Sequence, residues 1–302
     1  MKEFAGRTAV ITGAGSGLGL EVARLAARRG MNLAIADVQD DALERAAREL
    51  EGLGAQVLAQ RVDVSRAAEV ESLGGATAAC FGAPHVVFNN AGVGAGGLIW
   101  ENTVADWEWV IGVNLFGVAH GIRVFTPMML AAADADPAYR GHIVNTASMA
   151  GIINAPNMGV YNASKHAVVS MSETLFQDLR LVTDQIGASV LCPFFVPTGI
   201  TASDRNRPDA LKAAAKPTKS QLIGQAMTDR AVGRGKLSAA DVARFVFEAV
   251  DEDRFYIYSH PKSLGSVQTR MEDVIQARNP TDPFAAKPEI AESLRAALRG
   301  TD

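Results

Sequence analysis

The sequence alternates short apolar runs rich in β-branched residues with longer stretches of helical period, and this rhythm limits the possible folds more than any other feature. Seven of the short runs are predicted strands, at residues 8–12, 32–37, 56–62, 85–89, 142–147, 188–192 and 254–258. Six of the longer stretches are predicted helices, at residues 17–29, 40–53, 66–81, 104–132, 160–183 and 239–251. Strands that alternate with helices form a parallel sheet with helices on both faces. We therefore predict an α/β, doubly wound fold with a seven-stranded, mostly parallel sheet.

Two segments in the last third of the chain depart from this rhythm. Residues 203–236 carry eight Lys and Arg against three Asp, and they form an insertion between the sixth strand and the last helix. The insertion is either a lid whose charge favours a phosphate-bearing cofactor or an acidic substrate, or a solvated helical insertion. Three prolines between residues 280 and 288 then predict a linker. Beyond it an apolar stripe at helical spacing needs a surface to cover, of this chain or of a partner; the stripe consists of Ile290, Leu294, Ala297 and Leu298.

Composition and charge exclude several classes of protein. The 302 residues are 48% hydrophobic, and 29 Lys and Arg against 33 Asp and Glu leave a net charge of −4, which has no general attraction for nucleic acid or an anionic membrane. Glu3 and Arg7 interrupt the short apolar N-terminus, and the longest uncharged stretches are rich in Gly, Ser, Asn and Pro, so neither a signal peptide nor a membrane span is expected. We expect a cytoplasmic protein with no nucleic-acid or membrane partner.

The cysteines and histidines predict no metal site. Cys80 and Cys192 lie far apart and fit neither a disulfide framework nor a CxxC pattern. The five histidines show no HExxH or other metal-ligand spacing.

A glycine-rich loop follows the first predicted strand. Residues 12–19 read Thr-Gly-Ala-Gly-Ser-Gly-Leu-Gly and lead into a predicted helix, with Gly13, Gly17 and Gly19 in a GxxxGxG spacing. Glycines let the backbone approach a pyrophosphate, and the helix N-terminus offers free N–H groups and a positive dipole end. This arrangement predicts a dinucleotide site.

Asp37 ends the second predicted strand, 24 positions after Gly13. A carboxylate there accepts hydrogen bonds from the adenosine ribose hydroxyls and repels a 2′-phosphate. Neither Ser16 nor Val38 supplies a compensating basic side chain, so NAD is favoured over NADP. The alternative is that Asp37 only caps the following helix.

Four polar residues suggest proton transfer. Tyr161 and Lys165 are four apart on a predicted helix and share a face, where an ammonium lowers the pKa of a phenol so that it can act as a base. Ser148 ends the fifth predicted strand, where it can donate a hydrogen bond to a substrate oxygen; no GxSxG surrounds it, which disfavours a nucleophilic serine. Asn114 lies in an apolar helical stretch and, by itself, is a structural polar residue.

Together, these residues resemble the short-chain dehydrogenase/reductase family over about residues 5–260. The matching landmarks are the loop 12–19, Asp63-Val64, Asn89-Asn90-Ala91-Gly92, Asn114, Ser148, and Tyr161 with Lys165. The resemblance implies one Rossmann-type catalytic domain over residues 1–262, which includes the basic insertion at 199–236, and a C-terminal extension at 263–302.

The resemblance also implies a role for each residue. Tyr161 is the acid/base, Ser148 polarises the substrate oxygen, Lys165 also binds the nicotinamide ribose, and Asn114 holds a water that links Lys165 to a proton path. The implied cofactor contacts are Gly13, Ser16, Gly17, Leu18, Gly19, Asp37, Asp63, Val64, Asn90, Ala91, Gly92, Tyr161, Lys165, Pro193, Val196 and Thr198.

The segment after the sixth predicted strand departs from the family pattern at one position. Pro193, Val196 and Thr198 match, whereas Phe194 stands where the family has glycine, and its ring is expected to narrow the substrate pocket. The expected pocket is largely apolar. It comprises Met149, Ile153, Asn154, Phe194, Phe195 and the loop 93–100.

We therefore predict an NAD-dependent oxidoreductase that interconverts a hydrophobic, aromatic or alicyclic, secondary alcohol and its ketone by hydride transfer. One alternative is a reductase of a CoA- or carrier-linked 3-ketone, whose phosphates the basic insertion would contact. The other is a non-catalytic NAD-binding redox sensor, which has no need of a paired Tyr and Lys. Family members are usually homodimers or homotetramers, so self-association is expected.

Overall fold

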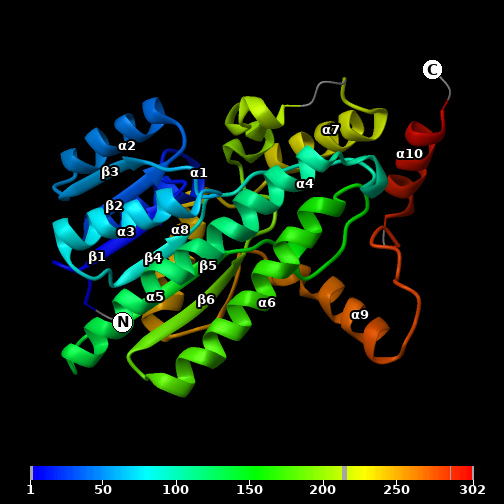
Figure 1. Cartoon of the computed structure of the whole chain (residues 1–302). Coiled ribbons are helices and arrows are strands. Elements are labelled where there is room, and N and C mark those ends of the chain that lie inside the picture. Colours follow the sequence, from blue (N-terminus) through cyan, green and yellow to red (C-terminus); the bar gives the residue numbers. More distant parts are fainter. Residues whose placement is uncertain (1–2, 213–215, 286, 301–302) are drawn as a thin grey trace.

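A computed structural model describes residues 3–212, 216–285 and 287–300 and shows one parallel sheet between two layers of helices (Figure 1). The seven strands follow the order β3-β2-β1-β4-β5-β6-β7, and all six pairings are parallel. The predicted doubly wound α/β fold is thereby confirmed. The strands are β1 (Thr8–Thr12), β2 (Asn32–Asp37), β3 (Val57–Arg61), β4 (Val86–Asn89), β5 (Gly141–Thr146), β6 (Ile186–Cys192) and β7 (Tyr256–Tyr258).

Successive strand residues face opposite layers, and both faces of the sheet are buried. In β1, Ile11 packs into the layer formed by α1, α2 and α8, whereas Val10 packs into the layer that contains α3, α5 and α6. Strands buried on both faces consist of continuous apolar runs, which is why these strands stood out in the sequence. The helices of the two layers are α1 (Gly17–Arg28), α2 (Asp40–Gly52), α8 (Ala239–Glu252), α3 (Ala67–Phe81), α4 (Val104–Ile111), α5 (Gly117–Ala135) and α6 (Gly159–Val182).

The helix predicted at 104–132 contains one irregular turn. A five-residue π-turn, η2 (Gly112–Phe116), separates α4 from α5 and has Asn114 at its centre. The run Val104–Ala135 is, among the described residues, the one helix long and apolar enough by composition to cross a membrane. Its Phe125 and Met129 are fully buried against the sheet and α3, and core helices of soluble proteins pass the same test. The expectation of no membrane span stays a prediction.

The basic insertion folds over the carboxyl ends of the strands. It forms two 3-10 turns, η4 (Gly199–Asn206) and η5 (Asp209–Leu211), and the helix α7 (Lys219–Gly233). Two further helices, α9 (Leu264–Ile275) and α10 (Pro288–Arg299), follow β7, and α10 packs against α7. In the C-terminal stripe Ile290, Leu294 and Leu298 are half-buried, whereas Ala297 is exposed. The stripe therefore covers a surface of its own chain.

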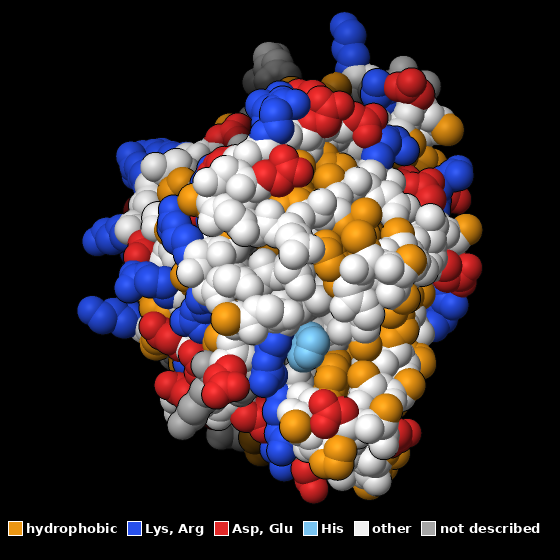
Figure 2. Space-filling view, turned by 90° about the vertical axis from the view of Figure 1, so that its left-hand side faces the viewer, with side chains coloured by type: hydrophobic (Ala, Val, Ile, Leu, Met, Phe, Trp, Pro, Cys, Tyr) orange, Lys and Arg blue, Asp and Glu red, His pale blue; other side chains and the backbone are white. Residues whose placement is uncertain are grey.

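The face of the molecule on the left of Figure 1 carries mixed charge. Figure 2 shows basic and acidic side chains interspersed around a band of hydrophobic ones. On the described part of this face no sign of charge dominates, in keeping with the net charge of −4. The expected absence of a nucleic-acid partner stays a prediction.

Candidate active site

A cavity of about 310 Å³ opens at the carboxyl edge of the sheet, between the loops after the strands and the folded insertion. Ligands of open α/β sheets bind at this edge. All the predicted cofactor contacts except Gly19 line the cavity. Gly19 is buried just beneath it, inside the glycine loop.

The glycine loop forms a tight cradle. Gly13 and Gly17 have φ values of +66° and +58°, which favour glycine. A Cβ at Gly19 would lie 2.1 Å from the carbonyl oxygen of Gly13, and one at Gly13 would lie 2.9 Å from the Cα of Ala91. Side chains at these positions would displace the turn at the N-terminus of α1. The cradle therefore fits a dinucleotide pyrophosphate.

Asn90 fastens this loop to the end of β4. Its side-chain amide donates to the carbonyl oxygens of Thr12 (3.0 Å) and Gly13 (3.3 Å). The hydroxyl of Thr12 accepts the backbone N–H groups of Asn90 (3.0 Å) and Ala91 (3.2 Å). These bonds connect the two loops that border the dinucleotide cleft.

Asp37 lines the cavity and also supports its walls. One carboxylate oxygen accepts the backbone N–H of Gly15 at 2.9 Å, and the other accepts the N–H of Gln39 at 3.0 Å. Gln39, and not Asp37, is the N-cap residue of α2, and no side-chain hydrogen bond caps this helix, so Asp37 is not its cap. A carboxylate has about four acceptor positions, so both oxygens keep capacity for ribose hydroxyls.

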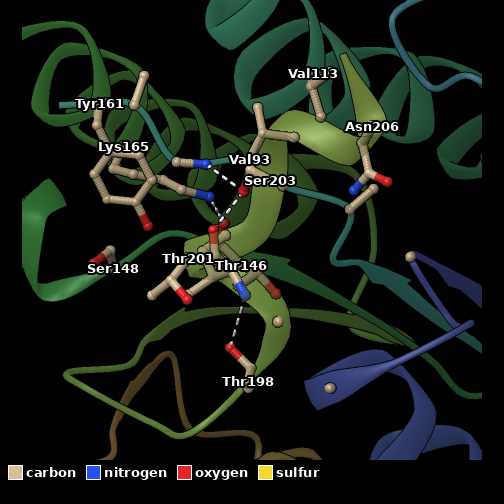
Figure 3. A pocket seen from close by; sticks show the side chains of 18 of the residues that line it. Val93, Val113, Thr146, Ser148, Tyr161, Lys165, Thr198, Thr201, Ser203 and Asn206 are labelled. Carbon is tan, nitrogen blue, oxygen red and sulfur yellow. Dashed lines mark hydrogen bonds between the residues drawn. The ribbon is translucent and has the colours of Figure 1, made fainter. Parts of the chain in front are cut away.

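Ser148, Tyr161 and Lys165 meet at one end of the cavity (Figure 3). Ser148 follows β5, where its oxygen accepts the backbone N–H of Ala150 at 3.1 Å. Tyr161 and Lys165 lie one turn apart at the start of α6, with the ammonium 5.8 Å from the centre of the phenol ring. The ammonium donates to the carbonyl oxygen of Thr146 at 2.9 Å.

Burial dominates the pKa values of these groups. The Lys165 side chain is 3% exposed, and burial lowers its pKa to about 8. Burial also raises the pKa of Tyr161, and the Ser148 hydroxyl partly opposes that effect. The expectation that Lys165 lowers the pKa of this phenol below its ordinary value is therefore wrong for the protein alone. Burial removes the phenolate anion from water, and the hydration free energy lost in this way exceeds the stabilisation that the nearby groups provide.

Asn114 is fully buried behind the cluster. Its side chain exchanges two hydrogen bonds with the backbone of Val93, at 2.8 and 3.0 Å, and donates to the hydroxyl of Ser164 at 3.1 Å. A Cβ at Gly92 would lie 3.4 Å from the Asn114 amide oxygen and 3.5 Å from the Lys165 nitrogen. Asn114 therefore lies next to Lys165 without lining the cavity.

The structure corrects part of the predicted substrate pocket. Met149, Ile153, Phe194 and Phe195 line the cavity, but Asn154 does not and is exposed instead. In the loop 93–100, only residues 93–96 line the cavity. The loop turns outward after them, and its Trp100 is 76% exposed.

Phe194 is held by the end of β7. Its backbone N–H donates to the Ser259 hydroxyl at 2.9 Å, and its ring centre lies 4.4 Å from that of Phe195 and 5.7 Å from that of His260. Phe194 is not among the described residues with a positive φ, so its backbone has no need of glycine. The ring forms one wall of the cavity, as predicted.

Several lining residues escaped the sequence analysis. Trp109 and Val113 come from α4 and η2, and a third group comes from the folded insertion. For the first two, the available signal was their own spacing of four residues, which puts both on one helix face. For the insertion no local pattern identifies which residues face the cavity; they include Ile200, Thr201, Ser203, Arg205, Asn206, Leu211, Gln225 and Thr228.

A glycine cradle that continues into a Ser, Tyr and Lys cluster at the carboxyl edge of a parallel sheet defines a Rossmann-type oxidoreductase. A family model described as short chain dehydrogenase matches residues 7–209. The chain therefore belongs to the short-chain dehydrogenase/reductase family.

Individual relatives agree with this assignment. A CLA biosynthesis dehydrogenase/reductase of Lactiplantibacillus plantarum is 32% identical over 91% of this chain and 95% of its own. A C alpha-dehydrogenase of Sphingobium sp. is 30% identical over 98% of this chain and 94% of its own. A short chain dehydrogenase/reductase from Burkholderia phymatum, crystallised in complex with NAD, is 53% identical with a TM-score of 0.91, covering 94% of this chain and 100% of that chain.

Proposed function

We propose that this oxidoreductase interconverts a hydrophobic secondary alcohol and its ketone with NAD as the cofactor. The observation that carries the proposal is the placement of Ser148, Tyr161 and Lys165 together at one end of a cavity whose other end holds the glycine cradle. The NAD complex of the Burkholderia phymatum relative supports the choice of cofactor.

The cofactor supplies hydride chemistry, and the protein supplies orientation and proton transfer. Tyr161 exchanges a proton with the substrate oxygen through its phenol. Because burial raises the pKa of this phenol, Tyr161 is protonated at neutral pH and ready to donate to a ketone. Oxidation of the alcohol requires the phenolate, so its rate rises with pH.

Three residues support Tyr161. The Ser148 hydroxyl donates to the substrate oxygen as negative charge develops there. Lys165 stabilises the phenolate electrostatically and binds the ribose beside the reacting ring. Asn114 acts on the reaction through Lys165, because the two side chains border the space beside Gly92 where a water can connect them.

Two features support NAD over NADP. Asp37 lies at the ribose end of the cleft, where a carboxylate repels a 2′-phosphate. Arg205 is the one guanidinium among the described lining residues, and it already donates to the carbonyl oxygens of Gly199 (2.8 Å) and Ala202 (2.7 Å).

The substrate end of the cavity supports an apolar alcohol. Met149, Ile153, Phe194 and Phe195 are apolar lining residues near Ser148 in sequence or space. In the insertion, Arg207 pairs with Asp106 at 2.7 Å and Lys212 pairs with Asp209 at 2.6 Å. These two pairs remove Arg207 and Lys212 from the basic side chains that could bind the phosphates of a CoA- or carrier-linked substrate.

Reduced-nicotinamide absorbance tests the proposal. Purified protein is assayed with NAD and NADP in parallel on aromatic and alicyclic secondary alcohols, with Tyr161→Phe as the control. Turnover with NAD that disappears in the variant supports the proposed reaction. Turnover confined to thioester-linked 3-hydroxy substrates supports the carrier-linked alternative. NAD binding without turnover of either class supports the redox-sensor alternative.

A further inference from the structure

The folded insertion reaches the end of the cavity that lies away from the proton-transfer cluster. In Figure 3, Asn206 and Val113 lie across the pocket from Tyr161. Val113 packs in the same apolar cluster as Val64, one of the two residues that the family resemblance places beside the adenine ring. Asn206 therefore lines the part of the cleft that takes the adenosine of the dinucleotide.

Gln39 holds Asn206 at this adenosine end. The side-chain amide of Gln39 donates to Oδ1 of Asn206 at 2.6 Å, and its backbone N–H donates to the carboxylate of Asp37 at 3.0 Å. Asp37 and Asn206 line the cavity, whereas Gln39 does not. The amide of Asn206 is thereby placed close to the carboxylate that is predicted to bind the adenosine ribose.

The next residue of the insertion is anchored to the other layer of helices. Arg207 pairs with Asp106 of α4 at 2.7 Å, and the two side chains are 9% and 6% exposed. The Asp106 carboxylate is itself fixed, because it accepts the N–H and the hydroxyl of Thr103 at 2.8 and 2.9 Å. α4 packs on α6, whereas α2, which begins directly after Gln39, packs in the layer of α1 and α8. Residues 206 and 207 therefore tie the insertion to both layers.

Two further contacts hold the same segment along the cleft. The hydroxyl of Ser203 accepts the backbone N–H of Gly94, in the loop after β4, at 3.0 Å. A Cβ at Gly17 would lie 3.3 Å from the Cβ of Thr198, so the segment starts beside the glycine cradle. We call residues 198–211 the strap, because they follow the cleft from this cradle to its adenosine end.

Asn206 keeps a hydrogen-bond donor for a ligand. Its Oδ1 is occupied by Gln39, whereas its Nδ2 has no hydrogen-bond partner among the described residues. The side chain is half-buried and lines the cavity. A ribose hydroxyl both donates and accepts hydrogen bonds. One that lies between the two side chains can donate to the Asp37 carboxylate and accept from the Asn206 amide.

We propose that the strap covers the adenosine end of the NAD cleft and that Asn206 binds the adenosine ribose as a hydrogen-bond donor. Gln39 is a positioning residue, since it holds the Asn206 amide in place without lining the cavity. The inference concerns the cofactor and goes beyond the proposed alcohol reaction, so it does not depend on which alcohol is the substrate.

Calorimetry with ADP-ribose tests the proposal, because this ligand carries the adenosine and the pyrophosphate but no nicotinamide. Asn206→Ala is expected to raise the Kd of ADP-ribose and of NAD by the same factor, about five- to tenfold, as loss of one hydrogen bond allows. An unchanged Kd for ADP-ribose would overturn the proposal, even if NAD binding were weakened. Thermal melting checks that each variant is folded.

Deoxy analogues of ADP test the assignment to the ribose. In wild type, 2′-deoxy-ADP or 3′-deoxy-ADP should bind more weakly than ADP. With the analogue that lacks the bound hydroxyl, Asn206→Ala and wild type should differ by less than about twofold in Kd, because the hydrogen bond is already absent. A loss of about five- to tenfold with both analogues would overturn the ribose assignment.

Gln39→Ala tests the positioning role. The substitution keeps the backbone N–H that Asp37 accepts, and no side-chain hydrogen bond caps α2, so the ends of β2 and α2 are undisturbed. The Kd of ADP-ribose should rise about two- to fivefold in the wild-type background and not at all in the Asn206→Ala background. Equal rises in both backgrounds would contradict an action through Asn206.

Asp204→Ala is the matched control. Asp204 lies on the same strap, is exposed and does not line the cavity, so its truncation should weaken neither ligand. Weakening as large as that of Asn206→Ala would assign the effect to a general disturbance of the strap and overturn the proposal. Since all these measurements concern binding, a protein that binds NAD and ADP-ribose as expected but turns over no alcohol would contradict the proposed function and not the strap.

Discussion

Replacement of Lys165 by Met tests whether the buried ammonium destabilises the fold at neutral pH. Burial lowers the pKa of Lys165 from 10.5 to about 8, and that difference corresponds to about 3 kcal/mol of folding free energy. Loss of the hydrogen bond to the carbonyl oxygen of Thr146 offsets about 1 kcal/mol of this gain. The inactive variant should therefore be more stable than wild type by about 2 kcal/mol at pH 7.

The sign of the pH dependence follows from the lowered pKa. Below about pH 8 the lysine is charged in both the folded and the unfolded protein, so wild type bears the full cost of burial. Between about pH 8 and 10.5 only the unfolded chain binds the proton, so wild-type stability rises with pH. The advantage of Lys165→Met should therefore fall to near zero at about pH 9.5 and reverse above about pH 10.

Thermal and urea unfolding at pH 7 and pH 9.5 measure this difference. At pH 7 the variant should melt about 4 °C higher, given roughly 2 °C per kcal/mol for a chain of this size. Lys262→Met is the control, because Lys262 is exposed and no buried ammonium is lost. A Lys165→Met protein that melts below wild type at pH 7 would refute the reasoning, as would an advantage that is the same at both pH values.

Three further substitutions or truncations probe the site. Asp37→Ala should narrow the NAD over NADP preference in kcat/KM about tenfold or more, since it removes the carboxylate that repels a 2′-phosphate; an unchanged ratio would place Asp37 away from the ribose. Phe194→Gly should broaden the range of accepted alcohols, because the ring is 37% exposed on the cavity wall while Ser259 holds only its backbone; an unchanged substrate profile would contradict this. Deletion of residues 280–302 removes α10 from its contact with α7, which contributes Gln225 and Thr228 to the cavity, so KM should rise several-fold with kcat unchanged; unchanged kinetics would show that α10 does not support the insertion.

The fold could be predicted from the sequence because each of its strands and helices has a local sequence pattern. A strand buried on both faces is a short apolar run, and a covering helix is a longer run with one apolar stripe. The ends of elements were harder to predict: in the run 254–258 only Tyr256–Tyr258 pair in register with β6 as a strand, although the carbonyl oxygen of Phe255 also accepts the N–H of Val190. The helix expected at 104–132 contains the π-turn at Asn114, where the side chain bonds to the backbone of Val93.

The sequence predicted those parts of the candidate site in which short spacing along the chain brings the groups together. Tyr161 and Lys165 share a helix face because they are four residues apart, and the glycine loop directly precedes its helix. Spacing did not reveal the electrostatic balance of the cluster, because the pKa values of Lys165 and Tyr161 depend on how many distant segments exclude water. It also placed Asn154 in the pocket, whereas that residue is exposed and does not line the cavity.

The sequence by itself determined the class of this protein: a parallel sheet, a dinucleotide loop and a hydroxyl–phenol–ammonium set, each encoded within a few neighbouring residues. Only the tertiary structure decided which side chains from distant segments pack around these groups. Asp106 and Arg207 are about a hundred positions apart yet form one buried ion pair beside Trp109. The physical reason is range: periodicity and turn chemistry act between near neighbours in the chain, whereas burial and pairing depend on segments that only folding brings together.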